Sequence, residues 1–162
     1  MKRNTTLFLA QGAMIAALYV ALTHLSNAVG LANGAVQFRL SEALCILSVF
    51  TPAAVPGLTV GCLIANLTTG CLWQDVLFGT LATLLGALGG RFLGRYPLLS
   101  PLPTVLANAL IVPPVLIWVY GAQDAYPLLL GGVALGEAVC AWGAGMILYY
   151  ALKPHAKRLF GA

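Results

Sequence analysis

Six long apolar stretches, separated by short polar, proline or glycine segments, take up most of this chain. Charged residues make up only 7% of the 162 residues, whereas they make up ~25% of an ordinary soluble domain. A bilayer core is crossed by ~20 helical residues, so six crossings require about 120 residues and leave about 40 for loops and tails. The pattern therefore predicts an all-α integral membrane protein, built as a bundle of six transmembrane helices.

The polar segments between the apolar stretches set the expected boundaries. We expect transmembrane helices at residues 6–25, 39–50, 56–72, 75–93, 103–120 and 128–152, within one domain that spans residues 1–162. The second helix is short for a full crossing, because Pro52 and Pro56 follow it closely. The uncharged loop at 26–38 has two interpretations: it folds over an outer cavity, or it is a simple connector.

The basic residues predict the orientation in the membrane. Short cytoplasmic loops carry an excess of Lys and Arg. With both termini in the cytoplasm, seven of the eight basic residues lie on the cytoplasmic side, and Arg39 alone lies outside. An odd number of crossings would place the basic C-terminal tail outside, so the charges favour six helices with both termini cytoplasmic.

Several classes of function have no supporting motif in the sequence. Lysine stands only at positions 2, 153 and 157, so no glycine-rich loop with a lysine is present, and we expect that the chain itself does not hydrolyse ATP. The basic residues come in pairs at loop ends rather than in a solvated cluster, which disfavours nucleic acid as a partner. No His-x-x-x-His pair and no Gly-x-Ser-x-Gly turn occurs, so we expect neither a metal site nor an enzyme.

Two glutamates lie within the apolar stretches and require an explanation. An ionisable group at a helix centre costs ~2.5 to 3.5 kcal/mol on insertion scales, so it needs a partner or a purpose. Glu137 is either a protonated acid bonded to a neighbouring helix or a substrate ligand. Glu42 lies three residues after Arg39, so the two side chains either form an ion pair or contribute to a binding site.

Further polar and aromatic side chains are expected in the outer half of the bundle, where they can converge with the glutamates. They are Asn66, Trp73, Asp75, Asn108 and Gln123. Carboxylates, amides and aromatic faces suit a flat heterocycle with several N–H donors, and an amine-bearing substrate fits them too. Bonds between helices explain the two asparagines equally well, and Trp73 also suits the membrane interface.

Small residues form a regular row on the first helix. Ala13, Ala17 and Ala21 recur every four residues and therefore share one face, beside a second row of Gly12 and Ala16. Such a face allows another helix to approach closely. It either packs within the bundle or docks a partner, and the lack of any ATPase motif in the chain favours a partner.

Three segments together resemble a known family. They are Val36-Gln-Phe-Arg-Leu-Ser-Glu-Ala-Leu44, Thr51-Pro-Ala-Ala-Val-Pro-Gly-Leu58 and Gly61-Cys-Leu-Ile-Ala-Asn-Leu67. They are similar to the QueT family, whose members are substrate-binding S components of energy-coupling factor (ECF) transporters in bacterial plasma membranes. The resemblance implies capture of a queuosine-related 7-deazaguanine, such as queuine, its precursor base or queuosine.

The resemblance also implies partners and a site. S components work with a coupling protein and two ATPase subunits, so ATP is used by the partners and we expect no cofactor on this chain. Ala13, Ala17 and Ala21 match the row that docks the coupling protein, and the bundle is expected to topple in the lipid bilayer to deliver its substrate. Loops and helices that frame the site in such proteins correspond here to Asn33, Gln37, Trp73, Asp75, Gln123 and Glu137.

Two alternatives remain open at this point. In the first, the chain is an S component for another vitamin-like heterocycle. In the second, it is a membrane subunit or an enzyme that has no role in transport. Tight saturable binding without turnover distinguishes a transporter component from an enzyme.

Overall fold

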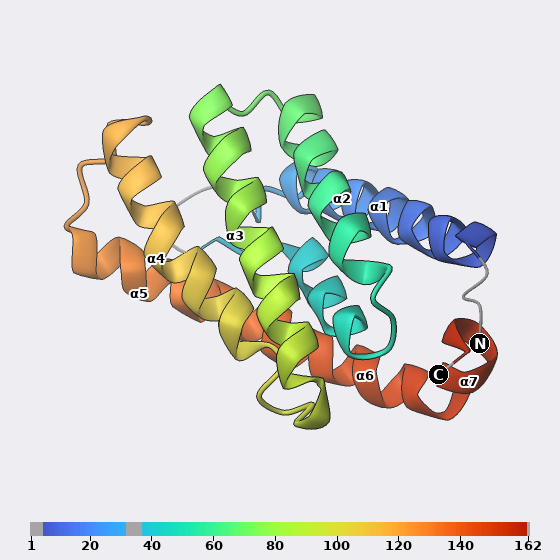
Figure 1. Ribbon diagram of the computed structural model, residues 1–162. Coiled ribbons are helices and arrows are strands. Elements are labelled where there is room, and N and C mark those ends of the chain that lie inside the picture. Colours follow the sequence, from blue (N-terminus) through green and yellow to red (C-terminus); the bar gives the residue numbers. More distant parts are fainter. Residues whose placement is uncertain (1–4, 32–36, 162) are drawn as a thin grey trace.

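A computed structural model describes residues 5–31 and 37–161, and these residues are helical with no strand among them (Figure 1). The α-helices are α1 (Thr5–Ala28), α2 (Ala54–Thr68), α3 (Trp73–Phe92), α4 (Leu102–Trp118), α5 (Tyr126–Glu137), α6 (Gly145–Leu152) and α7 (Ala156–Phe160). The remaining helical elements are the 3-10 helices η1 (Leu40–Val49), η2 (Leu93–Arg95) and η4 (Lys153–His155), and the π-helix η3 (Ala138–Ala144).

The expected all-helical class is confirmed, and each of the six predicted stretches contains helical structure. Three helical runs are long and apolar enough to cross a membrane: Thr5–Ala28, Trp73–Arg95 and Tyr126–Phe160. The other three are shorter apolar helices, Leu40–Val49, Ala54–Thr68 and Leu102–Trp118. Six crossings and cytoplasmic termini therefore stay predictions.

Large apolar side chains cover the outside of the bundle. Trp118 is 84% exposed and Phe92 is 85% exposed, and many leucines are exposed as well. A water-soluble monomer rarely exposes apolar patches of more than about 300 to 600 Å². Such a surface is instead suited to contact with lipid.

The second predicted helix has an unexpected form. Leu40–Val49 is a 3-10 helix of 10 residues, whereas 3-10 runs longer than about 4 residues are uncommon. At about 2.0 Å per residue it reaches about 20 Å, against about 15 Å for an α-helix of that length. Its side chains are mostly buried, and it packs against α1, α3, α6 and η3. The element thus forms part of the interior of the bundle.

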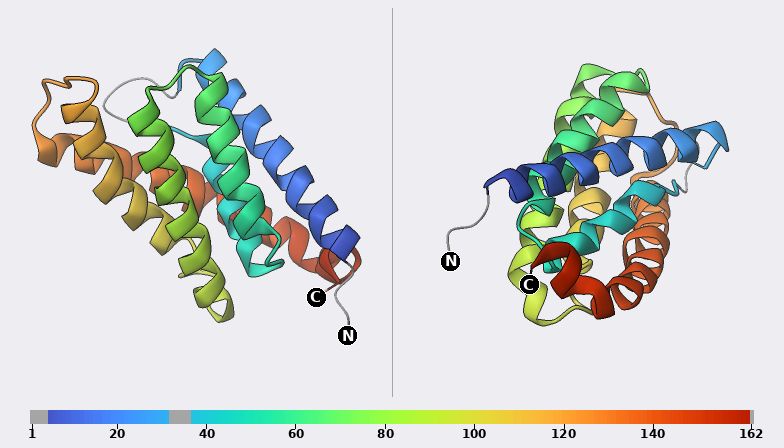
Figure 2. Two further views of the ribbon diagram at one scale, coloured as in Figure 1. Left: turned by 45° about the horizontal axis from the view of Figure 1, so that its top comes forward. Right: turned by 90° about the vertical axis from the view of Figure 1, so that its right-hand side faces the viewer.

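Close helix contacts use one of the two small-residue rows on α1. A Cβ added at Gly57 would lie 2.7 Å from the Gly12 carbonyl oxygen, and one added at Gly61 would lie 3.0 Å from the Ala16 Cα. The row of Gly12 and Ala16 therefore packs against α2, which lies beside α3, with α4 on the other side of α3 (Figure 2). The alanine row at positions 13, 17 and 21 remains exposed.

The C-terminal helix returns to the beginning of α1. The Gln11 side-chain amide donates a hydrogen bond to the Leu159 carbonyl oxygen at 2.9 Å. Phe160 stacks on Phe50 with ring centroids 5.5 Å apart, and Phe50 also stacks on Tyr149 at 5.2 Å. The beginning of α1 and the helix α7 thus lie at the same end of the bundle (Figure 2).

Candidate functional site

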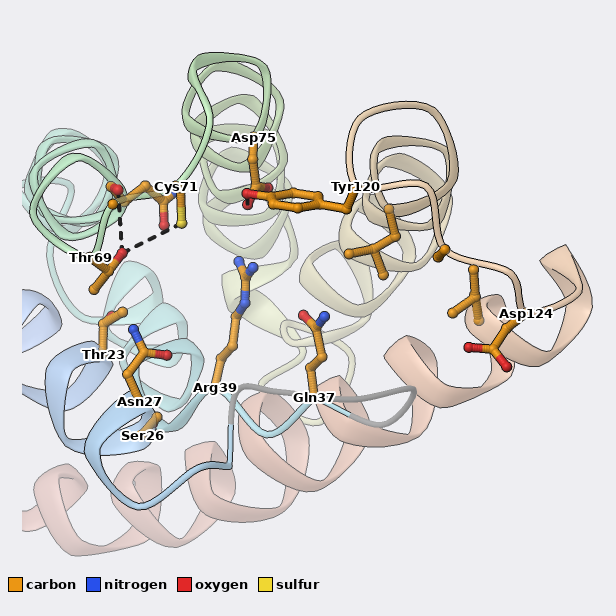
Figure 3. Close-up of a pocket in the computed structure, with 15 residues that line it drawn as sticks. Thr23, Ser26, Asn27, Gln37, Arg39, Thr69, Cys71, Asp75, Tyr120 and Asp124 are labelled. Carbon is orange, nitrogen blue, oxygen red and sulfur yellow. Dashed lines mark hydrogen bonds between the residues drawn. The ribbon is translucent and has the colours of Figure 1, made fainter.

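A cavity of about 680 Å³ lies at the end of the bundle away from α7 (Figure 2), and its lining residues are drawn in Figure 3. Its walls come from the last turns of α1 and α2, the beginning of α3, the end of α4, α5, and the segments around them. The lining residues are Thr23, Ser26, Asn27, Gln37, Arg39, Asn66, Thr69, Gly70, Cys71, Asp75, Leu116, Tyr120, Ala122, Asp124 and Leu129. The volume lies within the ~300 to 1,000 Å³ that is typical of small-molecule sites.

Hydrogen bonds from the end of α1 hold the segment that enters η1. The Leu40 backbone N–H donates to Ser26 Oγ at 3.1 Å, and Thr23 Oγ1 donates to Ser41 Oγ at 2.9 Å. The sequence predicted a helix end at 25, but α1 continues to Ala28, and the added turn carries Ser26 to the cavity. The short stretch with Gln37 and Arg39 is thereby fixed along one wall.

The same stretch lies directly on the backbone of α5. A Cβ added at Gly136 would overlap the Gln37 carbonyl oxygen and lie 2.9 Å from the Gln37 carbonyl carbon. Only glycine permits this approach, because real Cβ contacts below 3.0 Å are essentially never seen. Gly136 thus allows α5 to support the Gln37 wall of the cavity.

Asp75 is held in place by an aromatic hydroxyl from the turn that follows α4. Tyr120 OH donates to Asp75 Oδ2 at 3.1 Å and accepts a hydrogen bond from the Leu72 N–H at 3.2 Å. Partial burial raises the pKa of Tyr120 to about 12, and the negative charge of Asp75 also raises it. The hydroxyl therefore stays protonated at neutral pH. Asp75 also lies in the first turn of α3, where the helix dipole favours an anion.

Arg39 is the cation of the cavity among the described lining residues. Its guanidinium points towards Asp75 in Figure 3, and it interacts electrostatically with Asp75 and Glu42. The cavity wall therefore presents a carboxylate and a guanidinium side by side. This pair offers acceptors and donors to a flat polar ligand.

Glu42 is buried in the interior and is not among the described residues that line the cavity. Its carboxylate accepts hydrogen bonds from Tyr19 OH and from Cys45 Sγ, the latter at 3.2 Å. These partners come from α1 and from η1 itself. They give Glu42 a role in joining the two elements.

Two further predicted site residues are buried apart from the cavity lining. Glu137 is 3% exposed and Asn108 is 1% exposed. The Asn108 amide donates to the Thr104 carbonyl oxygen at 3.1 Å, while Asn108 Oδ1 and Glu137 Oε2 have no hydrogen-bond partner among the described residues. Glu137 interacts electrostatically with Glu42 and Arg39, so it belongs to the charged interior near η1.

The structure brings together four of the ten predicted binding residues at the cavity: Gln37, Arg39, Asn66 and Asp75. Trp73 is 69% exposed and Gln123 is also exposed, and neither is among the lining residues. Asn33 lies outside the described residues.

Sequence reasoning did not select several lining residues. Tyr120 and Asn27 lie at or beside helix ends, and a tyrosine there is also usual at a membrane interface. Asp124 directly follows Gln123, which was predicted as a binding residue. The charge of Asp124 in this polar turn was the feature that could have identified it as a lining residue. Cys71 carried no signal, because a single cysteine near an apolar run is most often a packing residue.

Comparisons with known proteins found a matching family model and a curated relative. The family model described as QueT transporter matches residues 9–154. A protein of Lactococcus lactis subsp. cremoris (strain MG1363) named queuosine precursor transporter QueT is 37% identical over 84 residues. That match covers 52% of this chain and 49% of the relative, about half the length of each. No solved structure matches. The family model covers most of the chain, which therefore belongs to the QueT transporter family, and the resemblance noted in the sequence is confirmed.

Proposed function

We propose that this member of the QueT transporter family is the substrate-binding S component of an ECF transporter and that it captures a queuosine-related 7-deazaguanine. The family supports transport, and the name of the Lactococcus relative supports the substrate class. The observation that carries the proposal is the cavity itself, in which Asp75 is fixed by Tyr120 and faces Arg39.

The chemistry of the cavity suits a guanine-like edge. Such an edge presents a ring N–H and an exocyclic amino group side by side, and one carboxylate accepts both bonds. Asp75 is the acceptor in this arrangement. The carbonyl oxygen beside that edge requires a donor, and Arg39 supplies it from the neighbouring wall. Gln37 and Asn27 offer further amide donors and acceptors around the ring.

The exposed face of α1 supports the proposed partners. The second small row packs on α2, whereas Ala13, Ala17 and Ala21 are exposed. We assign this free row to docking on the coupling protein, which works with two ATPase subunits that use ATP. In a bacterial plasma membrane with both termini cytoplasmic, the cavity opens outwards, and toppling of the docked bundle delivers the substrate.

Calorimetric titration of the purified protein tests the substrate class. Queuine and queuosine are the ligands, and guanine and thiamine are the controls. Saturable binding of a deazaguanine with little response to thiamine is the expected result. Binding of thiamine instead would favour an S component for another heterocycle, and turnover of any ligand would favour an enzyme.

A thiol-protection experiment tests whether the ligand occupies this cavity. Cys71 lines it and is half-buried, while Cys45, Cys62 and Cys140 are buried. A maleimide should therefore modify Cys71 in the folded protein, and a bound deazaguanine should slow that reaction. The Cys71→Ser variant is the control for labelling elsewhere. Unchanged labelling at saturating ligand would place the binding site away from this cavity.

A further inference from the structure

A buried polar cluster lies where η1, α4 and the end of α5 meet. Glu42 and Cys45 come from η1, Thr104 and Asn108 come from α4, and Glu137 comes from α5. Each of these side chains is at most 3% exposed. The Cys45 thiol interacts with Thr104 and with both glutamates. The Asn108 amide bonds to the Thr104 carbonyl oxygen at 3.1 Å, so the cluster continues along α4 by one turn.

Asn108 and Glu137 lie at the same depth in the bundle. The helices α4 and α5 pack against each other and run in opposite directions (Figure 1). Leu116 of α4 and Leu129 of α5 both line the cavity. Asn108 and Glu137 each lie eight residues deeper, which is about 12 Å at helical rise. The two polar side chains are therefore level with each other beneath the cavity.

The two glutamates of the cluster differ in the hydrogen bonds that they receive. Tyr19 OH donates to Oε1 of Glu42, and Cys45 Sγ donates to Oε2. Both carboxylate oxygens of Glu42 are thus supplied with donors, as an ionised carboxylate requires. Glu137 Oε2 receives no donor from the described residues, and neither does the acceptor Asn108 Oδ1. Buried acceptors without donors are costly, so Glu42 is suited to carry a charge and Glu137 is not.

The charges around the cluster lead to the same assignment. Arg39 interacts electrostatically with Glu42, Glu137 and Asp75. Among the described groups of this interior, three carboxyl groups therefore depend on one guanidinium. A buried charge without a partner is strongly unfavourable, and the group is neutralised instead. A proton on Glu137 removes one of the negative charges and also supplies the missing hydrogen-bond donor.

We infer that Glu137 is a protonation site, which holds a proton at neutral pH and donates it in a hydrogen bond to Asn108 Oδ1, so that this bond joins α5 to α4. One O–H group then satisfies both unpaired acceptors, and Glu42 remains a charged partner of Arg39. The bond fixes the end of α5, where the adjacent Gly136 supports the Gln37 wall of the cavity. Glu137 is therefore a positioning residue and not a ligand contact.

Infrared difference spectroscopy of the ligand-free protein at neutral pH tests the proton directly. The spectrum of the unmodified protein minus that of Glu137→Gln should contain the C=O band of a protonated carboxyl group, and this band should shift to lower frequency in D2O. The matched control is Glu42→Gln, which should remove a carboxylate band instead. A carboxylate band in the Glu137→Gln difference would overturn the inference, whatever the control shows. Because no ligand is present, the result is independent of the proposed function.

The variant Asn108→Leu tests the acceptor by the same spectroscopy. It replaces the amide by an apolar side chain, so the protonated carboxyl band of Glu137 should remain and move to higher frequency as its hydrogen bond is lost. An unchanged band would show that the proton is donated elsewhere and would overturn the assignment of Asn108.

Thermal unfolding in detergent tests the same bond without any substitution of Asn108. Glu137→Gln keeps a donor for Asn108 Oδ1, so its melting temperature should stay within about 2 °C of that of the unmodified protein. Glu137→Leu leaves that acceptor without a donor and should unfold several degrees lower. Equal melting temperatures of these two variants would overturn the hydrogen bond. A carboxylate band together with a melting temperature that rises in sodium chloride but not in choline chloride would replace the proton by a sodium ion and overturn the inference.

Discussion

The contact between Gly136 and Gln37 gives a sharp test of how the fold positions the cavity wall. We predict that Gly136→Ala weakens ligand binding although residue 136 does not line the cavity. The new methyl group would overlap the Gln37 carbonyl oxygen and lie 2.9 Å from the carbonyl carbon, where ordinary contacts begin near 3.4 Å. The segment with Gln37 and Arg39 must then move away from α5.

The size of the effect follows from two opposing contributions to stability and one to binding. Overpacking of this kind costs about 1 to 3 kcal/mol. Replacing glycine by alanine within a helix returns roughly 0.5 to 1 kcal/mol. Loss of one well-placed hydrogen bond that involves a charged group weakens binding by about 1.5 to 3 kcal/mol, or roughly ten- to a hundredfold in Kd. We therefore expect a modest loss of stability and a larger loss of affinity.

The matched control lies on the same helix. A Cβ at Gly131 meets no atom within 4 Å, so Gly131→Ala gains the same helix propensity without the clash. Both variants are compared with the unmodified protein by calorimetric titration with the bound deazaguanine and by thermal unfolding in detergent. Equal Kd values for the two variants would refute the reasoning, because they would show that the Gln37 segment either does not move or does not contact the ligand.

Four further substitutions separate the roles of individual residues, with binding measured by the same titration. Asp75→Asn should weaken ligand binding at least about tenfold. Tyr120→Phe removes only the hydroxyl that orients Asp75, so it should weaken ligand binding less. A larger loss in Tyr120→Phe than in Asp75→Asn would contradict the assignment of Asp75 as the direct acceptor. Ala17→Leu should abolish copurification with the coupling protein while ligand affinity stays unchanged, and loss of both would mean that the exposed row supports the bundle itself. Glu137→Gln should leave Kd within about twofold, because Glu137 is not among the described lining residues; a loss of about 1.5 to 3 kcal/mol would instead place its carboxylate in the site.

The helices were predictable because polar, proline and glycine residues separate long apolar stretches, and such stretches favour helices. The form of η1 was not, since its apolar residues mark a buried segment without revealing whether its hydrogen bonds run to the third or the fourth preceding residue. Asp75 and Asn66 were expected at the cavity because they lie at helix ends on the predicted outer side. Tyr120 was not selected, because its direction depends on the rotation of α4 against α3. Contacts such as that between Gly86 and Thr104 set this rotation, and they are visible only after folding.

The two rows on α1 explain how one helix can contribute to both binding and docking. Gly12 and Ala16 fix α1 against α2, while the exposed alanine row lies on another face of the same rigid element. The last turns of α1 carry Thr23, Ser26 and Asn27 to the cavity. Because Ala21 is only two residues from Thr23, a substitution that tilts α1 would disturb both surfaces together. Docking and ligand affinity must therefore be measured on the same preparation of Ala17→Leu, since only a loss of docking with unchanged affinity identifies the alanine row as a contact surface.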